Sequence, residues 1–178
     1  MMDFAIKTCF ASPASELVRA IWDDLAQDGI ATFMKTSGSF PGITLGVWEG
    51  GHEDSLRRMA EAFARKATRI TVESYGLASF PTDPAHVFLG IVPSDPLLQM
   101  HRLFHAVDPA TSAKSSEFYL PGSWVPHSTL ALRCRPDQIV RVTEICLGHN
   151  TRFKAEISAV GLVEIGTGRH IASFDLQG

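Results

Sequence analysis

Two similar eight-residue segments constrain the fold of this chain more than any other feature of its sequence. Residues 125–132 read VPHSTLAL, and residues 40–47 read FPGITLGV. When the two prolines are aligned, Thr44 matches Thr129, and Gly42 matches His127, which lies 85 residues further along a chain of 178. This spacing is close to half the chain length. It predicts two similar halves that each contribute one such strand to a shared site.

The second segment places a histidine and a threonine on one face of a strand. Side chains alternate between the two faces, so His127 and Thr129 point the same way and Ser128 points the other way. A histidine beside a hydroxyl combines a proton carrier with a hydrogen-bond donor, which suits a cleft better than an apolar core. The first segment retains only the hydroxyl, because Gly42 stands where a histidine is expected.

These segments resemble the paired His-x-Thr/Ser-x motifs of the 2H phosphoesterases, which include 2'-5' RNA ligases and 2',3'-cyclic phosphodiesterases. Residues 127–130, His-Ser-Thr-Leu, match one motif in full, whereas residues 42–45, Gly-Ile-Thr-Leu, lack its histidine. The resemblance implies an α+β fold made of two pseudo-symmetric lobes. Antiparallel sheets flanked by helices would then surround a central cleft.

The hydrophobic pattern predicts the same order of elements in both halves: strand, helix, motif strand, helix, strand. We expect strands at residues 4–10, 43–48, 69–78, 86–92, 125–132, 153–165 and 170–176. Helices are expected to begin near Ser12-Pro13, Asp54-Ser55, Ser94-Asp95-Pro96 and Pro136-Asp137. The turn at residues 80–84 predicts one domain, residues 1–178, with lobes of about 1–80 and 86–178.

A long loop at residues 108–124 precedes the intact motif and ends in the aromatic residues Phe118, Tyr119 and Trp124. Loops of this length are often functional. These rings would either stack a nucleobase or pack the loop onto the sheet. We take Tyr119, Trp124 and Gly42 as candidate substrate-binding residues.

The resemblance implies a mechanism that needs neither a metal nor a cofactor. One histidine takes a proton from water while the other gives a proton to the departing ribose oxygen of a 2',3'-cyclic phosphate. Two hydroxyls donate hydrogen bonds to the non-bridging oxygens. His127 would be the acid or the base, and Thr44 and Thr129 would hold the phosphate.

The absent histidine leaves three functions open. The loss of one proton carrier costs roughly 10²–10⁴ in rate, so an impaired phosphoesterase is the favoured function. The alternatives are a non-catalytic nucleotide- or phosphate-binding module and a ferredoxin-like duplication with no nucleotide role. Gly42 is expected to open space in the cleft, for a bulkier group or for a rescuing histidine: His52, His86 or His170. The Gly42→His substitution is then expected to raise activity.

A further pair of histidines, His101 and His105, has the i, i+4 spacing that a metal site on a helix can use. No glutamate follows His101 in the manner of an HExxH motif. We therefore interpret both histidines as polar positions that flank the apolar face of a helix.

The composition limits the partners. A net charge of −3 and a pI of about 6.1 favour a small nucleotide or an RNA terminus over a long duplex. No apolar run approaches the roughly 18 residues of a membrane span, and the first residues lack a secretory signal. The three cysteines form no CxxC motif, which indicates reduced thiols. We expect a cytoplasmic monomer.

Overall fold

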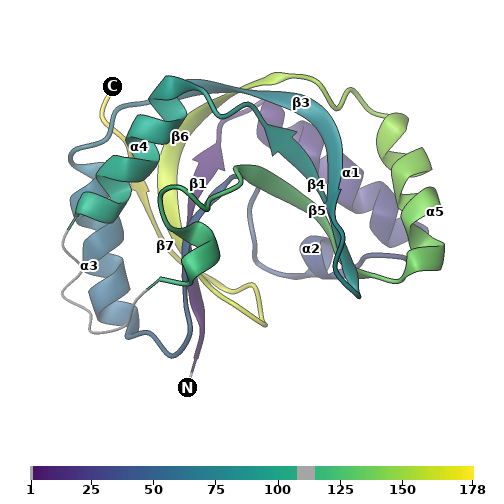
Figure 1. Ribbon diagram of the computed structural model, residues 1–178, viewed down its shortest axis with the longest axis horizontal. Helices are drawn as coiled ribbons and strands as arrows, with labels where there is room; N and C mark the ends of the chain where they lie inside the picture. Colours follow the sequence, from purple (N-terminus) through teal and green to yellow (C-terminus); the bar gives the residue numbers. More distant parts are fainter. Residues whose placement is uncertain (1, 108–114) are drawn as a thin grey trace.

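The computed structural model describes residues 2–107 and 115–178, which form an α+β fold with one seven-stranded antiparallel sheet and five α-helices (Figure 1). The strands in chain order are β1 (Phe4–Phe10), β2 (Thr44–Trp48), β3 (Ile70–Phe80), β4 (Ala85–Ile91), β5 (His127–Cys134), β6 (Lys154–Glu164) and β7 (His170–Asp175). The helices are α1 (Ala14–Gln27), α2 (Phe33–Thr36), α3 (Glu53–Ala64), α4 (Asp95–Ala106) and α5 (Pro136–Leu147), with a 3-10 turn η1 at Glu117–Tyr119.

The order of the strands is symmetric. It runs β2-β1-β6-β3-β4-β5. Exchanging β1 with β4, β2 with β5 and β3 with β6 gives the same order read from the opposite edge of the sheet. Both motif strands, β2 and β5, therefore lie at edges of the sheet. Strand β3 joins the halves, because Ile70–Glu73 pair with β6 and its later residues pair with β4. The additional strand β7 pairs with β6.

The predicted elements are present, but they form one continuous sheet instead of the separate antiparallel sheets expected of two lobes, because β3 pairs with both β6 and β4. Every expected strand and helix overlaps an observed one. The one-turn helix α2 was not predicted, because four residues are too short to show helical periodicity. Of the long loop, residues 108–114 lie outside the described residues, and the later part contains η1.

The helices gather at two sides of the sheet, with α3 and α4 on one side and α1 and α5 on the other (Figure 1). Helix α1 buries Val18, Ile21, Trp22 and Leu25, which recur at helical spacing. Its neighbours include β5, so a helix from the first half of the chain packs on the motif strand of the second half.

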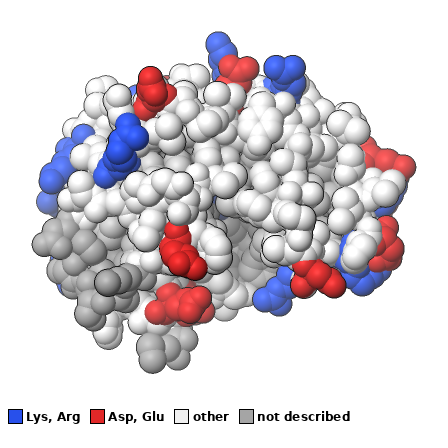
Figure 2. Space-filling view, viewed as in Figure 1, with Lys and Arg blue, Asp and Glu red and all other residues white. Residues whose placement is uncertain are grey.

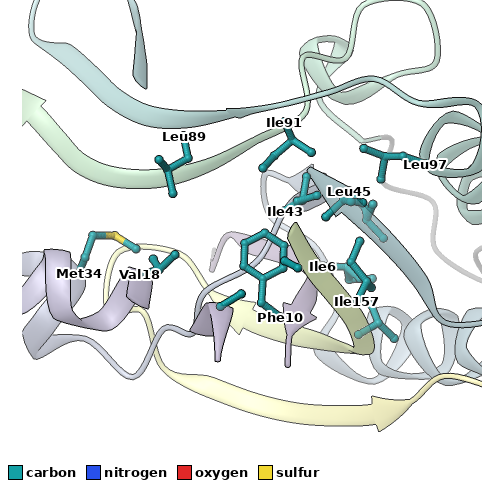
Figure 3. Close-up of a cluster of buried hydrophobic side chains, with 14 of the residues drawn as sticks. Ile6, Phe10, Val18, Met34, Ile43, Leu45, Leu89, Ile91, Leu97 and Ile157 are labelled. Atoms are coloured by element: carbon teal, nitrogen blue, oxygen red, sulfur yellow. The ribbon is translucent and has the colours of Figure 1, made fainter. Parts of the chain in front are cut away.

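One apolar core connects both halves of the sheet. Figure 3 shows Ile6, Leu45 and Ile157 close together, with Leu89 and Ile91 of β4 directed toward the same cluster. All five side chains are fully or almost fully buried. Because interiors are close-packed, this core holds β2 and β5 at fixed positions relative to each other.

Two surface observations bear on partners. Among the described residues, no helix is both long enough and apolar enough to cross a membrane. On the face shown in Figure 2, charged side chains of both signs are scattered, and no basic patch forms there.

Candidate functional site

Thr44 and Thr129 line the same small cavity of about 150 Å³. Thr44 is the first residue of β2, and Thr129 is the third residue of β5. Both threonines are half-buried. Lys7, Ser39 and Tyr119 also line this cavity. The fold thus brings together two hydroxyl-bearing residues that are 85 positions apart, from strands at opposite edges of the sheet.

A second, larger cavity of about 350 Å³ adjoins the first, because Tyr119 lines both. His127 lines this larger cavity together with Phe80, Phe118 and His86. The surface here is mainly aromatic and apolar. The two cavities together provide a polar compartment beside an apolar one.

The imidazole of His127 is held in one orientation. Its Nδ1–H donates a hydrogen bond to the carbonyl oxygen of Val125 at 2.7 Å. The ring also packs against Phe80 and Phe88, with centroids 5.1 and 5.0 Å away. Because Nδ1 carries the proton, Nε2 keeps a free lone pair that can accept one.

The surroundings of His127 keep its ring neutral. Burial lowers the pKa of His127, and the charges of Lys7 and His86 lower it further. The bond to the Val125 carbonyl raises the pKa but does not outweigh these effects. A neutral imidazole with a free Nε2 is a competent general base near neutral pH.

Two tryptophans satisfy the backbone carbonyls of the motif threonines. Trp124 Nε1–H donates to the Thr44 oxygen at 2.9 Å, and Trp22 Nε1–H donates to the Thr129 oxygen at 3.1 Å. An edge strand presents carbonyls that the sheet leaves unpaired, and a buried carbonyl without a partner is costly. The two indole N–H groups therefore supply the hydrogen bonds that the carbonyls of Thr44 and Thr129, on the two edge strands, do not receive from a neighbouring strand.

The comparisons with known proteins bear on the family and the fold. A family model described as the 2'-5' RNA ligase superfamily matches residues 29–169, which include both motif segments. The chain belongs to the 2'-5' RNA ligase superfamily. The resemblance seen in the two motifs is thereby confirmed at the level of the superfamily.

Solved structures share the fold over almost the full chain. E. coli LigT complexed with 3'-AMP is 13% identical with a TM-score of 0.63, and each chain is covered to 99%. The protein TT0787 of Thermus thermophilus is 15% identical with a TM-score of 0.62, and 100% of this chain and 99% of that one are covered. Kluyveromyces marxianus Usb1 is 8% identical with a TM-score of 0.50 and 98% coverage of both chains. No curated protein sequence matches the chain.

Gly42 plays a different part in this superfamily member from the one expected. A Cβ on Gly42 would lie 1.7 Å from the carbonyl oxygen of Thr8, so the glycine leaves no open space. The adjacent backbone is bound to β1: Thr8 N–H donates to Ile43 O at 2.8 Å, and Phe10 N–H donates to Pro41 O at 3.0 Å. The expectation that Gly42 makes room in the cleft is wrong, because this position faces the backbone of β1.

The three histidines considered as replacements lie elsewhere. His52 is exposed at the N-terminus of α3, and His170 is exposed on β7, where its Nε2 is 2.7 Å from Ser173 Oγ. His86 lines the larger cavity beside His127. None of the described histidines lines the small cavity.

The structure instead places Lys7 in the small cavity. Its residue is only 8% exposed, and it pairs in register with Thr44 across β1 and β2. Lys7 was not among the residues predicted for the site. A signal was available, since it is the one charged residue in the otherwise apolar or uncharged strand FAIKTCF.

The interpretation of His101 as a flanking polar position is wrong, because this residue is buried, whereas His105 is half-buried beside it. His101 is 1% exposed, and the Nε2 atoms of both rings lie 3.2 Å from the carbonyl oxygen of Leu45. The His101 ring stacks on Trp124 at 3.8 Å. Burial lowers the pKa of both histidines, that of His101 to about 4, so they are neutral partners of a β2 edge carbonyl.

The late part of the long loop also binds the edge of β2. Ser116 N–H donates to Val47 O at 2.7 Å, and Val47 N–H donates to Ser115 Oγ at 3.3 Å. Of the aromatic residues in this loop, Trp124 packs the loop down and has one ring face covered by His101. Phe118, by contrast, is 72% exposed where it lines the larger cavity.

We predict that Trp124→Phe lowers the free energy of unfolding by about 1–3 kcal/mol, because it leaves the Thr44 carbonyl without its donor. Urea denaturation followed by circular dichroism measures this change. Phe118→Leu, an exposed change in the same loop, is the control and should stay within about 0.5 kcal/mol. Equal stability of Trp124→Phe and wild type would show that the indole bond is not needed.

Proposed function

We propose that this chain is a 2H-type phosphoesterase that hydrolyses a 2',3'-cyclic phosphate at the end of a nucleotide or RNA. The observation that carries the proposal is that Thr44 and Thr129 line one cavity that adjoins the cavity of His127. In this proposal the single domain has two lobes, residues about 1–80 and 86–178, and the site lies in the cleft between them. The symmetric strand order supports such a duplication.

The small cavity suits a phosphoryl group. The hydroxyls of Thr44 and Thr129, which both line this cavity, would donate hydrogen bonds to non-bridging oxygens, where negative charge grows during attack. His127 acts as the general base, because its free Nε2 and its lowered pKa suit it to take a proton from water. None of these roles requires a metal ion.

The larger cavity suits a nucleoside. Its volume of about 350 Å³ and its aromatic lining by Phe80, Phe118 and Tyr119 fit a stacked base better than a second phosphate. Solved structures of E. coli LigT hold 3'-AMP, NADP+ and ATP, which supports a nucleotide ligand for this chain too. The lack of a basic patch on the face in Figure 2 favours a chain end over a long duplex.

The second candidate is a binding module that holds a nucleotide phosphate without cleaving it. One observation favours it, namely that no imidazole lines the small cavity among the described residues, since His127 lines the adjoining larger one. Such a module would use the same threonines and the same apolar compartment. The two candidates differ only in turnover.

The test follows adenosine 2',3'-cyclic phosphate by ³¹P nuclear magnetic resonance, in the presence of a chelator, and adenosine 3'-phosphate binding by calorimetry. We expect both turnover to a phosphomonoester and binding. Binding without turnover would select the module, and the absence of both would overturn the proposed function. A loss of this turnover in His127→Ala would link it to this site.

We predict that Thr44→Val and Thr129→Val each lower kcat by roughly 10²-fold, because each removes one donor to the developing charge. Valine keeps the shape of threonine, so circular dichroism should show an unchanged fold. Thr71→Val, an exposed threonine on β3, is the matched control. Wild-type rates in both motif variants would exclude the small cavity as the phosphate site.

A further inference from the structure

Lys7 is a buried cation without a charged partner. Its Nζ donates a hydrogen bond to Ser39 Oγ at 3.4 Å and lies 5.1 Å from the centroid of Phe40. Among the described residues no carboxylate lies within ion-pair distance of this nitrogen. Glu164 lines the same cavity, but it pairs with Arg169 at 2.9 Å. Buried charges are normally paired, so an unpaired ammonium that lines a cavity favours the binding of an anion there.

The symmetry of the sheet shows which position Lys7 occupies. Lys7 of β1 is paired with Thr44 of β2, and Phe88 of β4 is paired with Thr129 of β5. Because β1 and β2 correspond to β4 and β5, Lys7 corresponds to Phe88. The Phe88 ring contacts the imidazole of His127 at 5.0 Å. The equivalent position in the first half therefore lies next to the place where a motif histidine would be.

We propose that Lys7 is the second proton carrier of this site, in place of the histidine that the first motif lacks. It would also bind a phosphoryl oxygen through its ammonium group. This inference rests on the proposed function and adds a catalytic residue to it. Lys7 is suited to this role because it lines the small cavity from β1, whereas His127 lines the adjoining larger cavity from β5, and an in-line displacement needs its acid and base on opposite sides of phosphorus.

The charge state of Lys7 fits an acid near neutral pH. Burial lowers the pKa of Lys7 to about 8, Arg19 lowers it as well, and Cys9 acts in the opposite direction. Lys7 is therefore mainly protonated at pH 7, yet it gives up its proton far more readily than an exposed lysine. The titratable or charged groups that surround it are Cys9 of β1, Arg19 of α1, Tyr119 of η1, His127 of β5 and the paired Glu164 of β6.

The proton balance of the step is complete. His127 Nε2 takes one proton from water, and the water oxygen forms a bond to phosphorus. The bond from phosphorus to one ribose oxygen breaks, and Lys7 gives one proton to that oxygen. The product is a phosphomonoester beside an imidazolium and a neutral amine, and proton exchange with solvent then restores both groups.

The sign of the pH dependence follows from these two groups. His127 must be neutral, so the rate rises as pH rises through its lowered pKa, below 6.5. Lys7 must be charged, so the rate falls as pH rises through about 8. A bell-shaped profile of kcat/KM is expected between these limits.

The test compares Lys7→Met and Lys7→Arg with wild type, using adenosine 2',3'-cyclic phosphate for turnover and inorganic phosphate for binding. We expect Lys7→Met to lower kcat by about 10²–10⁴ and to abolish phosphate binding. Lys7→Arg should keep phosphate binding within a few-fold but lose turnover and the fall in rate near pH 8, because arginine does not release its proton. Lys154→Met, an exposed lysine on β6, is the matched control and should match wild type.

Folding and function are separated by two further readouts. Lys7→Met removes an unpaired buried charge, so it should melt at the same or a higher temperature than wild type. Two results would overturn the role of Lys7 while the proposed function stands. One is turnover in Lys7→Met equal to that of wild type. The other is a loss of turnover in His86→Ala without a loss of turnover in Lys7→Met. If wild type binds phosphate without turnover and Lys7→Met binds it equally well, the role is also overturned. Absence of both binding and turnover in wild type overturns both inferences together.

Discussion

Gly42→His is expected to destabilise the protein by about 3 kcal/mol or more and to leave it without added activity. A Cβ at this position lies 1.7 Å from the Thr8 carbonyl oxygen, and a backbone atom cannot move away as the tip of a side chain can. The segment from Pro41 to Ile43 must therefore separate from β1, with loss of its hydrogen bonds to Thr8 and Phe10. Urea denaturation followed by circular dichroism gives the change in unfolding free energy.

Two variants sharpen this measurement. Gly42→Ala adds only the Cβ and should account for most of the loss, which assigns the effect to the backbone contact. Gly148→Ala is the control, because its Cβ would lie 3.2 Å from the Ile145 oxygen at a helix end, and a change below about 1 kcal/mol is expected. A stable Gly42→His protein with a raised rate of cyclic phosphate hydrolysis would contradict this account of position 42.

His127→Ala is expected to lower kcat for a 2',3'-cyclic nucleotide by about 10²–10⁴, because it removes the proposed general base. Its signature is the pH profile. The acid limb of wild-type kcat/KM reflects loss of the neutral imidazole below its lowered pKa, so this limb should be absent in the variant. Initial rates between pH 5 and 9 measure both effects.

Controls for this variant are available in the chain. The His127 ring packs against both Phe80 and Phe88, so His127→Gln is a second variant that keeps most of the side-chain volume. His52→Ala, at the exposed start of α3, should match wild type within about two-fold. Unchanged turnover in both His127 variants would remove this histidine from the mechanism.

The elements of the fold were predictable because their signals are local. Helix α1 shows apolar residues at helical spacing, and the two motif segments show strand alternation after a proline. The two motif segments, half a chain apart, led to the superfamily that the family model confirms. Helix α2 was missed because one turn carries no periodic signal.

The candidate site was only partly predictable. Thr44 and Thr129 were selected from the repeated motif, and the structure places both in one cavity. Trp124 was considered for base stacking, whereas its indole N–H binds the Thr44 carbonyl. The hydrogen-bond partner of His101 could not be predicted from the sequence, because it is the carbonyl oxygen of Leu45, 56 residues away.

The amino-acid sequence alone was enough to establish the duplicated motif, the order of the elements and the superfamily, since each of these can be recognised from short runs of neighbouring residues. The roles of Gly42 and Lys7 emerged only from the folded chain. One depends on a backbone oxygen of β1 that the glycine approaches, and the other on the register that aligns Lys7 with Thr44. Both are contacts between separate strands, and the spacing of residues within one strand does not predict which residues of another strand they will contact.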